Sequence, residues 1–194
     1  MRKIFLDCGT HFGQGLESIA SLKNITNSWE IYSWEANPFT FNNFEKENFR
    51  PDLNIKFYNQ AISSADGHLT LNVETMKGDN HTGQGSSIID LEKWNNPMHK
   101  GQFLQQVSVP AIDFSSYIKN NFSIDDYIII KMDIEGAEYN VLDKMITDSS
   151  VDFIKELYIE WHSRFFPNKD ELKEKEKLIL DILTGKGILV NNWI

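Results

Sequence analysis

Residues 4–15 read IFLDCGTHFGQG, an apolar run that ends in Asp7 and continues into a turn with three glycines. Glycine permits tight turns, and the helix start that follows offers unpaired backbone N–H groups to a polar or anionic ligand. The dinucleotide-binding pattern is G-x-G-x-x-G directly after the strand. Here an acid comes first and the glycines are spaced G-x-x-x-G-x-G. The stretch therefore predicts a strand–turn–helix unit for a nucleotide-type cofactor other than NAD.

A second acid ends the next apolar stretch. Residues 30–35 read EIYSWE, and Ala36-Asn37-Pro38 then opens a helix. In a doubly wound sheet, a carboxylate at the tip of the second strand accepts hydrogen bonds from the ribose hydroxyls of an adenosine. Glu35 is therefore the candidate ribose ligand. The alternative is that Glu35 is only the solvated end of a strand.

Strand and helix signals alternate along the whole chain. This order predicts an α/β fold with a doubly wound, mostly parallel sheet covered by helices on both faces. The predicted strands are residues 3–7, 30–35, 55–62, 68–73, 105–109, 127–133, 156–161 and 188–190. The predicted helices are residues 13–22, 38–48, 113–120, 137–145 and 170–183.

Length and composition restrict the class of protein. A chain of 194 residues fits one domain, residues 1–194, and 41% hydrophobic with 24% charged residues is ordinary for a soluble protein. A net charge of −9 argues against nucleic acid as a partner, and no apolar run approaches the length of a membrane span. The short amino-terminal apolar run and the single Cys8 lead us to expect a cytoplasmic protein without disulfides.

A long stretch rich in Gly, Asn and Ser interrupts the alternation at residues 77–100. Long loops in compact domains are often functional. One interpretation is a substrate loop in which Gly83, Gly85, Ser86 and Ser87 lie close to a ligand. The other is a disordered insertion.

Four predicted strands end in titratable side chains. Asp7, Glu35 and Asp133 end three of them, and the fourth ends in Glu160-Trp161-His162. Ligands of open α/β sheets bind at the carboxyl ends of the strands, so we expect these side chains to meet in one crevice.

Asp133, Glu160 and His162 are the candidate catalytic residues, and two interpretations of them stay open. In one, the three hold Mg²⁺ or Mn²⁺, because carboxylates suit both ions and Mn²⁺ also accepts imidazole. In the other there is no metal, Asp133 touches cofactor or substrate, and His162 is a general base near its unperturbed pKa. Each residue also has a purely structural interpretation, in an ion pair or at a strand end.

Taken together, four motifs resemble the FkbM family of S-adenosylmethionine-dependent methyltransferases. They are DCGTHFG at 7–13, WEANP at 34–38, KMDIEGAE at 131–138 and YIE at 158–160. The third is the most specific of these motifs. The resemblance implies a Rossmann-like sheet with a reversed last strand. It also implies methyl transfer from S-adenosylmethionine to a hydroxyl of a sugar, glycan or sugar-bearing metabolite.

The resemblance also implies roles for individual residues. Asp7, Gly9 and Gly13 would form the methionine-side pocket, Glu35 would bind the ribose, and Asp133 would face the transferred methyl group. The implied cofactor contacts are Asp7, Gly9, Thr10, His11, Gly13, Glu35, Ala36, Asn37, Ala61, Ile62 and Asp133, with Ala61 and Ile62 beside the adenine. The chain departs from the family at C-G-T-H, where a G-A-N type of turn is common.

Two other classes of function compete with this one. A NAD-dependent oxidoreductase on a related sheet would share the glycine turn and the ribose acid. A non-catalytic protein with the methyltransferase fold would bind a partner through its loop.

Overall fold

The computed structural model describes residues 1–44, 46, 48–74, 85–90 and 103–193. Its main sheet has six strands in the order β3-β2-β1-β7-β8-β9, and every pair of neighbours is parallel. The strands are Lys3–Cys8 (β1), Glu30–Trp34 (β2), Ile55–Tyr58 (β3), Tyr127–Met132 (β7), Ile154–Ile159 (β8) and Leu189–Asn192 (β9). The predicted α/β class with a doubly wound, Rossmann-like sheet is confirmed.

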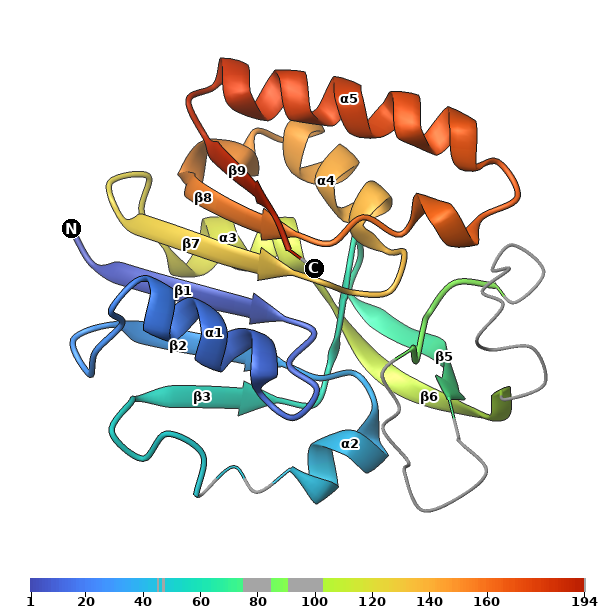
Figure 1. Cartoon of the computed structure of the whole chain (residues 1–194), viewed down its shortest axis with the longest axis horizontal. Coiled ribbons are helices and arrows are strands. Elements are labelled where there is room, and N and C mark those ends of the chain that lie inside the picture. Colours follow the sequence, from blue (N-terminus) through green and yellow to red (C-terminus); the bar gives the residue numbers. More distant parts are fainter. Residues whose placement is uncertain (45, 47, 75–84, 91–102, 194) are drawn as a thin grey trace.

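Helices connect these strands and cover both faces of the sheet (Figure 1). They are Gln14–Leu22 (α1), Pro38–Asn43 (α2), Phe114–Asn121 (α3), Glu138–Thr147 (α4) and Lys169–Gly185 (α5), with short 3-10 turns at Ser150–Phe153 and Ser163–Phe165. Among the described residues, no helix combines the length and the apolar character that crossing a bilayer requires.

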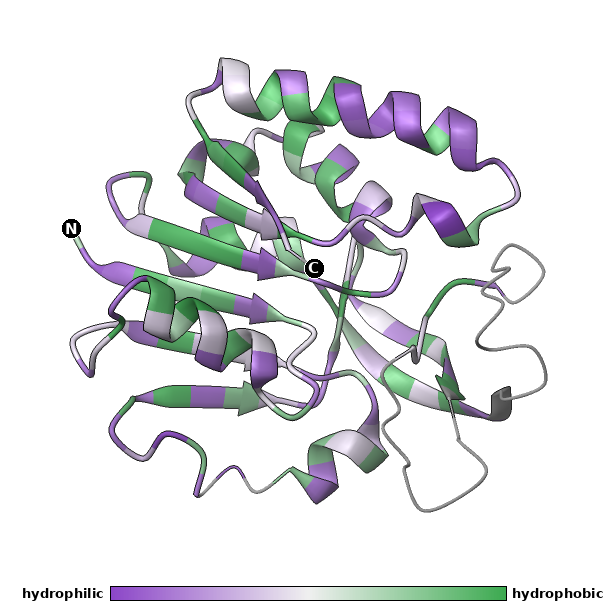
Figure 2. Cartoon of the chain, viewed as in Figure 1, coloured by the Kyte–Doolittle hydropathy of each residue, from purple (hydrophilic) through white to green (hydrophobic). Residues whose placement is uncertain are grey.

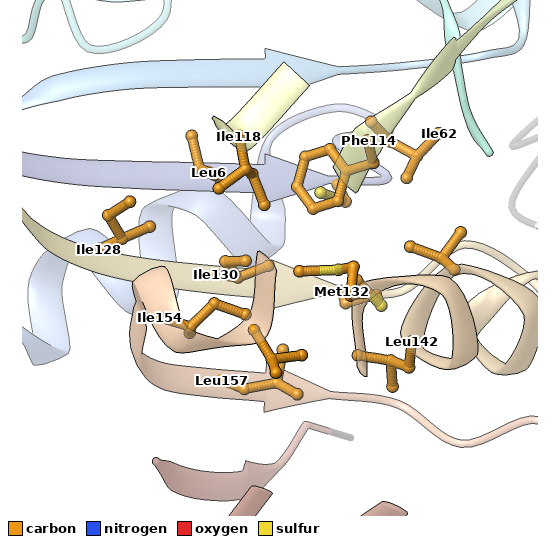
Figure 3. Packing of buried hydrophobic residues seen from close by; sticks show 14 of the residues in the cluster. Leu6, Ile62, Phe114, Ile118, Ile128, Ile130, Met132, Leu142, Ile154 and Leu157 are labelled. Carbon is orange, nitrogen blue, oxygen red and sulfur yellow. The ribbon is translucent and has the colours of Figure 1, made fainter. Parts of the chain in front are cut away.

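Alternation along the strands divides the core between the two faces. On β7, Ile128, Ile130 and Met132 face α3, α4 and α5, while Ile129 faces α1. Figure 3 shows the first of these clusters, in which strand residues meet Phe114 of α3. The strands are largely apolar, whereas much of α5 is hydrophilic (Figure 2), as expected for central strands under an outer helix.

A second, three-stranded sheet lies on the side toward which the strands of the main sheet point (Figure 1). Its strands are Ala61–Ser63 (β4), Gly67–Glu74 (β5) and Phe103–Asp113 (β6), in the order β4-β6-β5. The single strand predicted for residues 55–62 was therefore wrong. The amide of Asn59 donates to the backbone carbonyls of Glu35 and Ala36 at 2.7 and 3.2 Å, and this turn separates β3 from β4.

The last strand is not reversed, which corrects the sequence-based prediction. β9 pairs in parallel with β8 from Glu156↔Leu189 to Ile159↔Asn192. The cause is α5, which carries the chain back along the sheet so that β9 begins at the same edge as β8.

The second helix is also shorter than the predicted 38–48. It ends at Asn43, because Phe44 adopts an extended backbone. The ring of Phe44 packs edge-on against those of Phe49 and Phe57, with centroids 5.0 and 5.3 Å away.

The carboxylate of Asp126 fastens the amino-terminal residues to the start of β7. It accepts hydrogen bonds from the backbone and guanidinium N–H groups of Arg2 at 2.6–3.1 Å, and from the backbone N–H of Ser123 at 2.8 Å. Burial opposes its charge, but these donors prevail and lower the pKa of Asp126 from 3.8 to about 2. The ionised carboxylate therefore stabilises the fold above about pH 4, and this contribution is lost as the pH falls toward 2.

We expect Asp126→Asn to lower the free energy of unfolding by about 1–2 kcal/mol at neutral pH, allowing for the 43% exposed side chain of Arg2. The difference from the wild type should shrink as the pH falls from about 4 toward 2, and urea unfolding at several pH values measures it. Asp125→Asn, on an exposed neighbour, is the control and should have little effect. A loss that does not change with pH would contradict this account.

Candidate active site

A row of polar side chains crosses three neighbouring strands beneath α1. Ser33 of β2, Asp7 of β1 and Lys131 of β7 are register partners, so their side chains point to the same face. The Ser33 hydroxyl donates to Oδ2 of Asp7 at 2.8 Å, and Nζ of Lys131 lies 3.9 Å from Oδ1. Asp7 is 0% exposed and Lys131 is 2% exposed. The row is therefore an enclosed polar network.

Lys131 joins this row to the glycine turn and to Asp133. Its Nζ donates to the carbonyl of Gly9 at 2.6 Å and lies 3.2 Å from Oδ2 of Asp133. Burial disfavours the ammonium ion, but Asp133 and Asp7 outweigh burial and raise the pKa of Lys131. Burial also raises the pKa of Asp7, although Lys131 and Ser33 act against it. A buried pair of this kind is sensitive to loss of either partner.

The glycines of the turn make room for protein atoms. Gly9 has φ of 85°, and a Cβ there would lie 1.8 Å from the carbonyl oxygen of Asp133. Gly13, with φ of 86°, would place a Cβ 2.5 Å from the ring of Phe49, and Gly15 would place one 2.8 Å from Cε of Lys131. The ends of β1 and β7 therefore approach closely because position 9 lacks a side chain.

Glu35 lies just beyond β2, with its carboxylate held in place by the backbone. Oε2 accepts the N–H of His11 at 2.8 Å, and Oε1 accepts the N–H of Asn37 at 2.7 Å. Burial raises the pKa of Glu35, while these two donors lower it. Each oxygen keeps a further lone pair, and the side chain stays partly exposed. The predicted ribose acid is thus preorganised and open to further donors.

The side chains of the flanking residues are largely committed to the fold. Oδ1 of Asn37 caps α2 by accepting the N–H of Phe39 at 3.0 Å, and its amide donates to Ser86 at 3.1 Å. The Thr10 hydroxyl is buried against Ser33 and donates to the carbonyl of Trp34 at 3.1 Å.

The remaining predicted cofactor residues lie in different surroundings. Ala36 is partly exposed beside Glu35, and the ring of His11 lies near the amide of Gln14. Ala61 and Ile62 stand in β4, and their side chains pack in two hydrophobic clusters. Their predicted contact with adenine stays a prediction.

A cluster of acids surrounds His162 where β7 and β8 end. Nδ1 of the imidazole lies 3.0 Å from Oε1 of Glu138. Nε2 lies 3.4 Å from Glu135, 3.7 Å from Glu160 and 3.8 Å from Asp133. The structure thus brings together the three candidate catalytic residues, and it adds Glu135 and Glu138 to them.

The electrostatics of this cluster correct one expectation about His162. Burial disfavours the imidazolium, yet Glu138, Glu135 and Asp133 outweigh burial and raise the pKa of His162 to about 9. The imidazole therefore does not titrate near its unperturbed pKa. Burial also raises the pKa of Glu135 to about 8, despite the opposing effect of His162.

Three residues of this site were missed or underestimated by sequence reasoning. Lys131 shares a face with Asp133 because the two are separated by one residue on an extended segment. Glu138 accepts the N–H of Ile134 at 2.9 Å and contacts His162. The dense K-x-D-x-E-G-x-E pattern was the available signal for Lys131, Glu135 and Glu138.

Part of the predicted substrate loop is attached to the edge of this site. Ser87 pairs with Asn72 of β5, and its hydroxyl donates to the carbonyl of Glu135 at 2.6 Å. With the contact between Asn37 and Ser86, residues 85–90 connect the turn after β2 to the turn after β7. The other residues of 77–100, including Gly83, lie outside the described residues.

Comparisons with known proteins place the chain in a family. It is similar to the crystal structure of methyltransferase FkbM from Methylobacillus flagellatus KT, with 12% sequence identity and a TM-score of 0.45. The similarity covers 93% of this chain and 37% of the length of that one. No curated protein matches the sequence. The profile of the methyltransferase FkbM domain matches residues 7–187, and the chain therefore belongs to the FkbM methyltransferase family.

Proposed function

We propose that this protein transfers the methyl group of S-adenosylmethionine to a hydroxyl oxygen of a sugar, glycan or sugar-bearing metabolite. Family membership supports methyl transfer. The observation that carries the proposal is the preorganised carboxylate of Glu35 at the same sheet edge as the acids around His162. The carboxylate of Glu35 suits a ribose, and the acids around His162 suit hydroxyl groups that must be bound and deprotonated.

Glu35 and the residues of the glycine turn fit such a cofactor in two ways. Each carboxylate oxygen of Glu35 accepts one backbone N–H, which leaves a lone pair on each oxygen for the two ribose hydroxyls. Asp7 and Thr10 are enclosed, so they would act through the turn that they support rather than by direct side-chain contact. Gly9, His11 and Gly13 would contribute backbone to the pocket.

Bound S-adenosylmethionine supplies a methyl group on a positively charged sulfur. The protein has to align the acceptor oxygen and remove its proton. Asp133 has a side chain 21% exposed, whereas that of His162 is 1% exposed. The acceptor would therefore reach the carboxylate before the imidazole. We assign the proton-accepting role to Asp133, with Lys131 and His162 as the residues that position it.

The carboxylates around His162 also suggest which class of acceptor the protein binds. Carboxylate oxygens of Asp133, Glu135 and Glu160 accept hydrogen bonds from hydroxyls, and together with the net charge of −9 they disfavour nucleic acid. Residues 85–90 would border the acceptor side, because Ser87 is attached to Glu135. The free, buried thiol of Cys8 is consistent with the cytoplasmic location that forms part of this proposal.

Calorimetric titration with S-adenosylmethionine, S-adenosylhomocysteine and NAD tests the cofactor assignment. We expect binding of the two sulfur compounds and a weakening of about 10- to 100-fold in Glu35→Ala, because hydrogen bonds to a charged group are lost. Glu30→Ala is the matched control, since Glu30 is the first residue of the same strand and lies at the opposite end of it from Glu35. It should bind the cofactor like the wild type.

Other outcomes of this titration would redirect the assignment. Binding of NAD alone would favour an oxidoreductase, and binding of none of the three would favour a non-catalytic protein. If the sulfur compounds bind, transfer of a labelled methyl group to a panel of sugars and glycans tests the acceptor class. Labelling of amines but not of hydroxyls would contradict O-methyl transfer.

A further inference from the structure

We infer that Asp133, Glu135 and Nε2 of His162 form a binding site for one divalent cation of the Mg²⁺ and Mn²⁺ type. One ligand atom from each residue lies within 4.8 Å of the other two. An octahedral cation with ligands at about 2.1 Å holds neighbouring ligand atoms about 3.0 Å apart and opposite ones about 4.2 Å apart. The observed 3.4 and 3.8 Å from Nε2 to Glu135 and Asp133 lie between these two spacings.

The set differs from the one considered from sequence, because Glu135 replaces Glu160. Oε1 of Glu160 is already bonded to the guanidinium of Arg164. Glu135 is engaged differently: its backbone carbonyl is held by Ser87, while its carboxylate faces His162. The carboxylate of Glu135 therefore remains available to a cation.

Charge balance gives an independent reason for a cation. Among the described residues, five carboxylates lie close to Lys131 or His162, and three cationic side chains face them. The carboxylates are those of Asp7, Asp133, Glu135, Glu138 and Glu160, and the cations are Lys131, His162 and Arg164. Uncompensated negative charge out of water is unfavourable. Because a metal-bound imidazole is neutral, only Lys131 and Arg164 would then face the five carboxylates, and a divalent ion would offset two of the three excess negative charges.

Glu138 supports the site from behind. Its Oε1 meets Nδ1 of His162 at 3.0 Å and is itself fixed by the N–H of Ile134 at 2.9 Å. Metal-binding histidines commonly engage a carboxylate through the second ring nitrogen, which fixes the ring and its tautomer. Oε2 of Glu138 is buried and has no hydrogen-bond partner in the described part of the chain. The buried acid thus directs Nε2 toward Asp133 and Glu135.

The site opens toward solvent on the side of the two carboxylate ligands. Asp133 and Glu135 have side chains 21% and 20% exposed, while His162 lies behind them. Water can complete the coordination of Mg²⁺ or Mn²⁺. If the proposed function holds, and this role rests on it, a cation here would lower the pKa of an acceptor hydroxyl, and the carboxylate of Asp133 would accept its proton.

Titration of the purified full chain with Mn²⁺, followed by electron paramagnetic resonance and calorimetry, tests the inference. We expect one bound ion, and binding weaker by at least about tenfold in Glu135→Gln and in Asp133→Asn. Glu138→Gln should weaken it by about 10- to 100-fold through the orientation of His162. Asp181→Asn, which removes an exposed carboxylate of α5, should leave Mn²⁺ affinity unchanged. Glu160→Gln should have a smaller effect than Glu135→Gln.

Two results would overturn the site: wild-type protein that binds no Mn²⁺, or equal Mn²⁺ affinity in Glu135→Gln and Asp181→Asn. Circular dichroism and S-adenosylhomocysteine binding of each variant show whether the fold and the cofactor pocket are intact. These readouts also separate the two proposals. Cofactor binding without Mn²⁺ binding would contradict the cation site and leave the proposed methyltransferase function standing. Mn²⁺ binding without cofactor binding would support the cation site and contradict the proposed function.

Discussion

Alanine at position 9 is expected to lower the free energy of unfolding by about 2–5 kcal/mol, a large part of the stability of an ordinary domain. Two costs add. An L-residue at φ of 85° costs about 1–2 kcal/mol. The new Cβ would also lie 1.8 Å from the carbonyl oxygen of Asp133, and forcing this contact apart costs about 1–3 kcal/mol or more. Because that neighbour is backbone, the ends of β1 and β7 must separate, and Asp133 should move with them.

Alanine at two other glycines separates the cost of the positive φ from the cost of the close contact, and urea unfolding measures the loss in each variant. Gly187 has φ of 80° and open space around it, so Gly187→Ala should show only the conformational cost of about 1–2 kcal/mol. Gly13→Ala should fall between the two, because the ring of Phe49 can turn aside. Equal losses in Gly9→Ala and Gly187→Ala would show that the contact with Asp133 does not constrain the turn.

The convergence of acids could be predicted because it depends on topology alone. Parallel strands that alternate with helices bring their carboxyl ends to one edge, so acids that end four strands must lie along it. The structure confirms this for Asp7, Asp133 and Glu160, which lie near Lys131 or His162. The spacing of apolar residues was likewise enough to predict most helices and strands, because their apolar positions face the core.

The details of the site depend on backbone geometry that periodicity does not reveal. Glu135 has φ of 53°, and Gly136 follows with φ of 99°, so the backbone turns here between β7 and α4. This turn directs the carboxylate of Glu135 toward His162, where sequence reasoning had considered Glu160. The break between β3 and β4 has a similar origin, since it depends on hydrogen bonds from Asn59 to residues far away in the chain.

Replacing Lys131 with methionine is expected to lower the free energy of unfolding by about 3–5 kcal/mol, since it leaves the buried carboxylate of Asp7 without its cationic partner. Lys131 is 2% exposed and lies between Asp7, which is fully buried, and Asp133. Methionine fills a similar volume, so the loss would report the charge and the hydrogen bond to Gly9 rather than a cavity. Chemical denaturation at neutral pH measures it, and cofactor affinity should fall as well because the turn loses its anchor.

Matched variants show whether the buried charge is the cause. Asp7→Asn keeps an acceptor for the Ser33 hydroxyl, so the double variant Asp7→Asn/Lys131→Met should regain a substantial part of the lost stability. Lys144→Met removes a part-exposed lysine that pairs with Asp113 at 3.3 Å and should cost no more than about 1 kcal/mol. A Lys131→Met protein as stable as Lys144→Met, or a double variant no better than Lys131→Met alone, would mean that Lys131 does not compensate Asp7. In that case the polar row beneath α1 would depend on hydrogen bonds to Ser33 and the turn instead of on the ion pair.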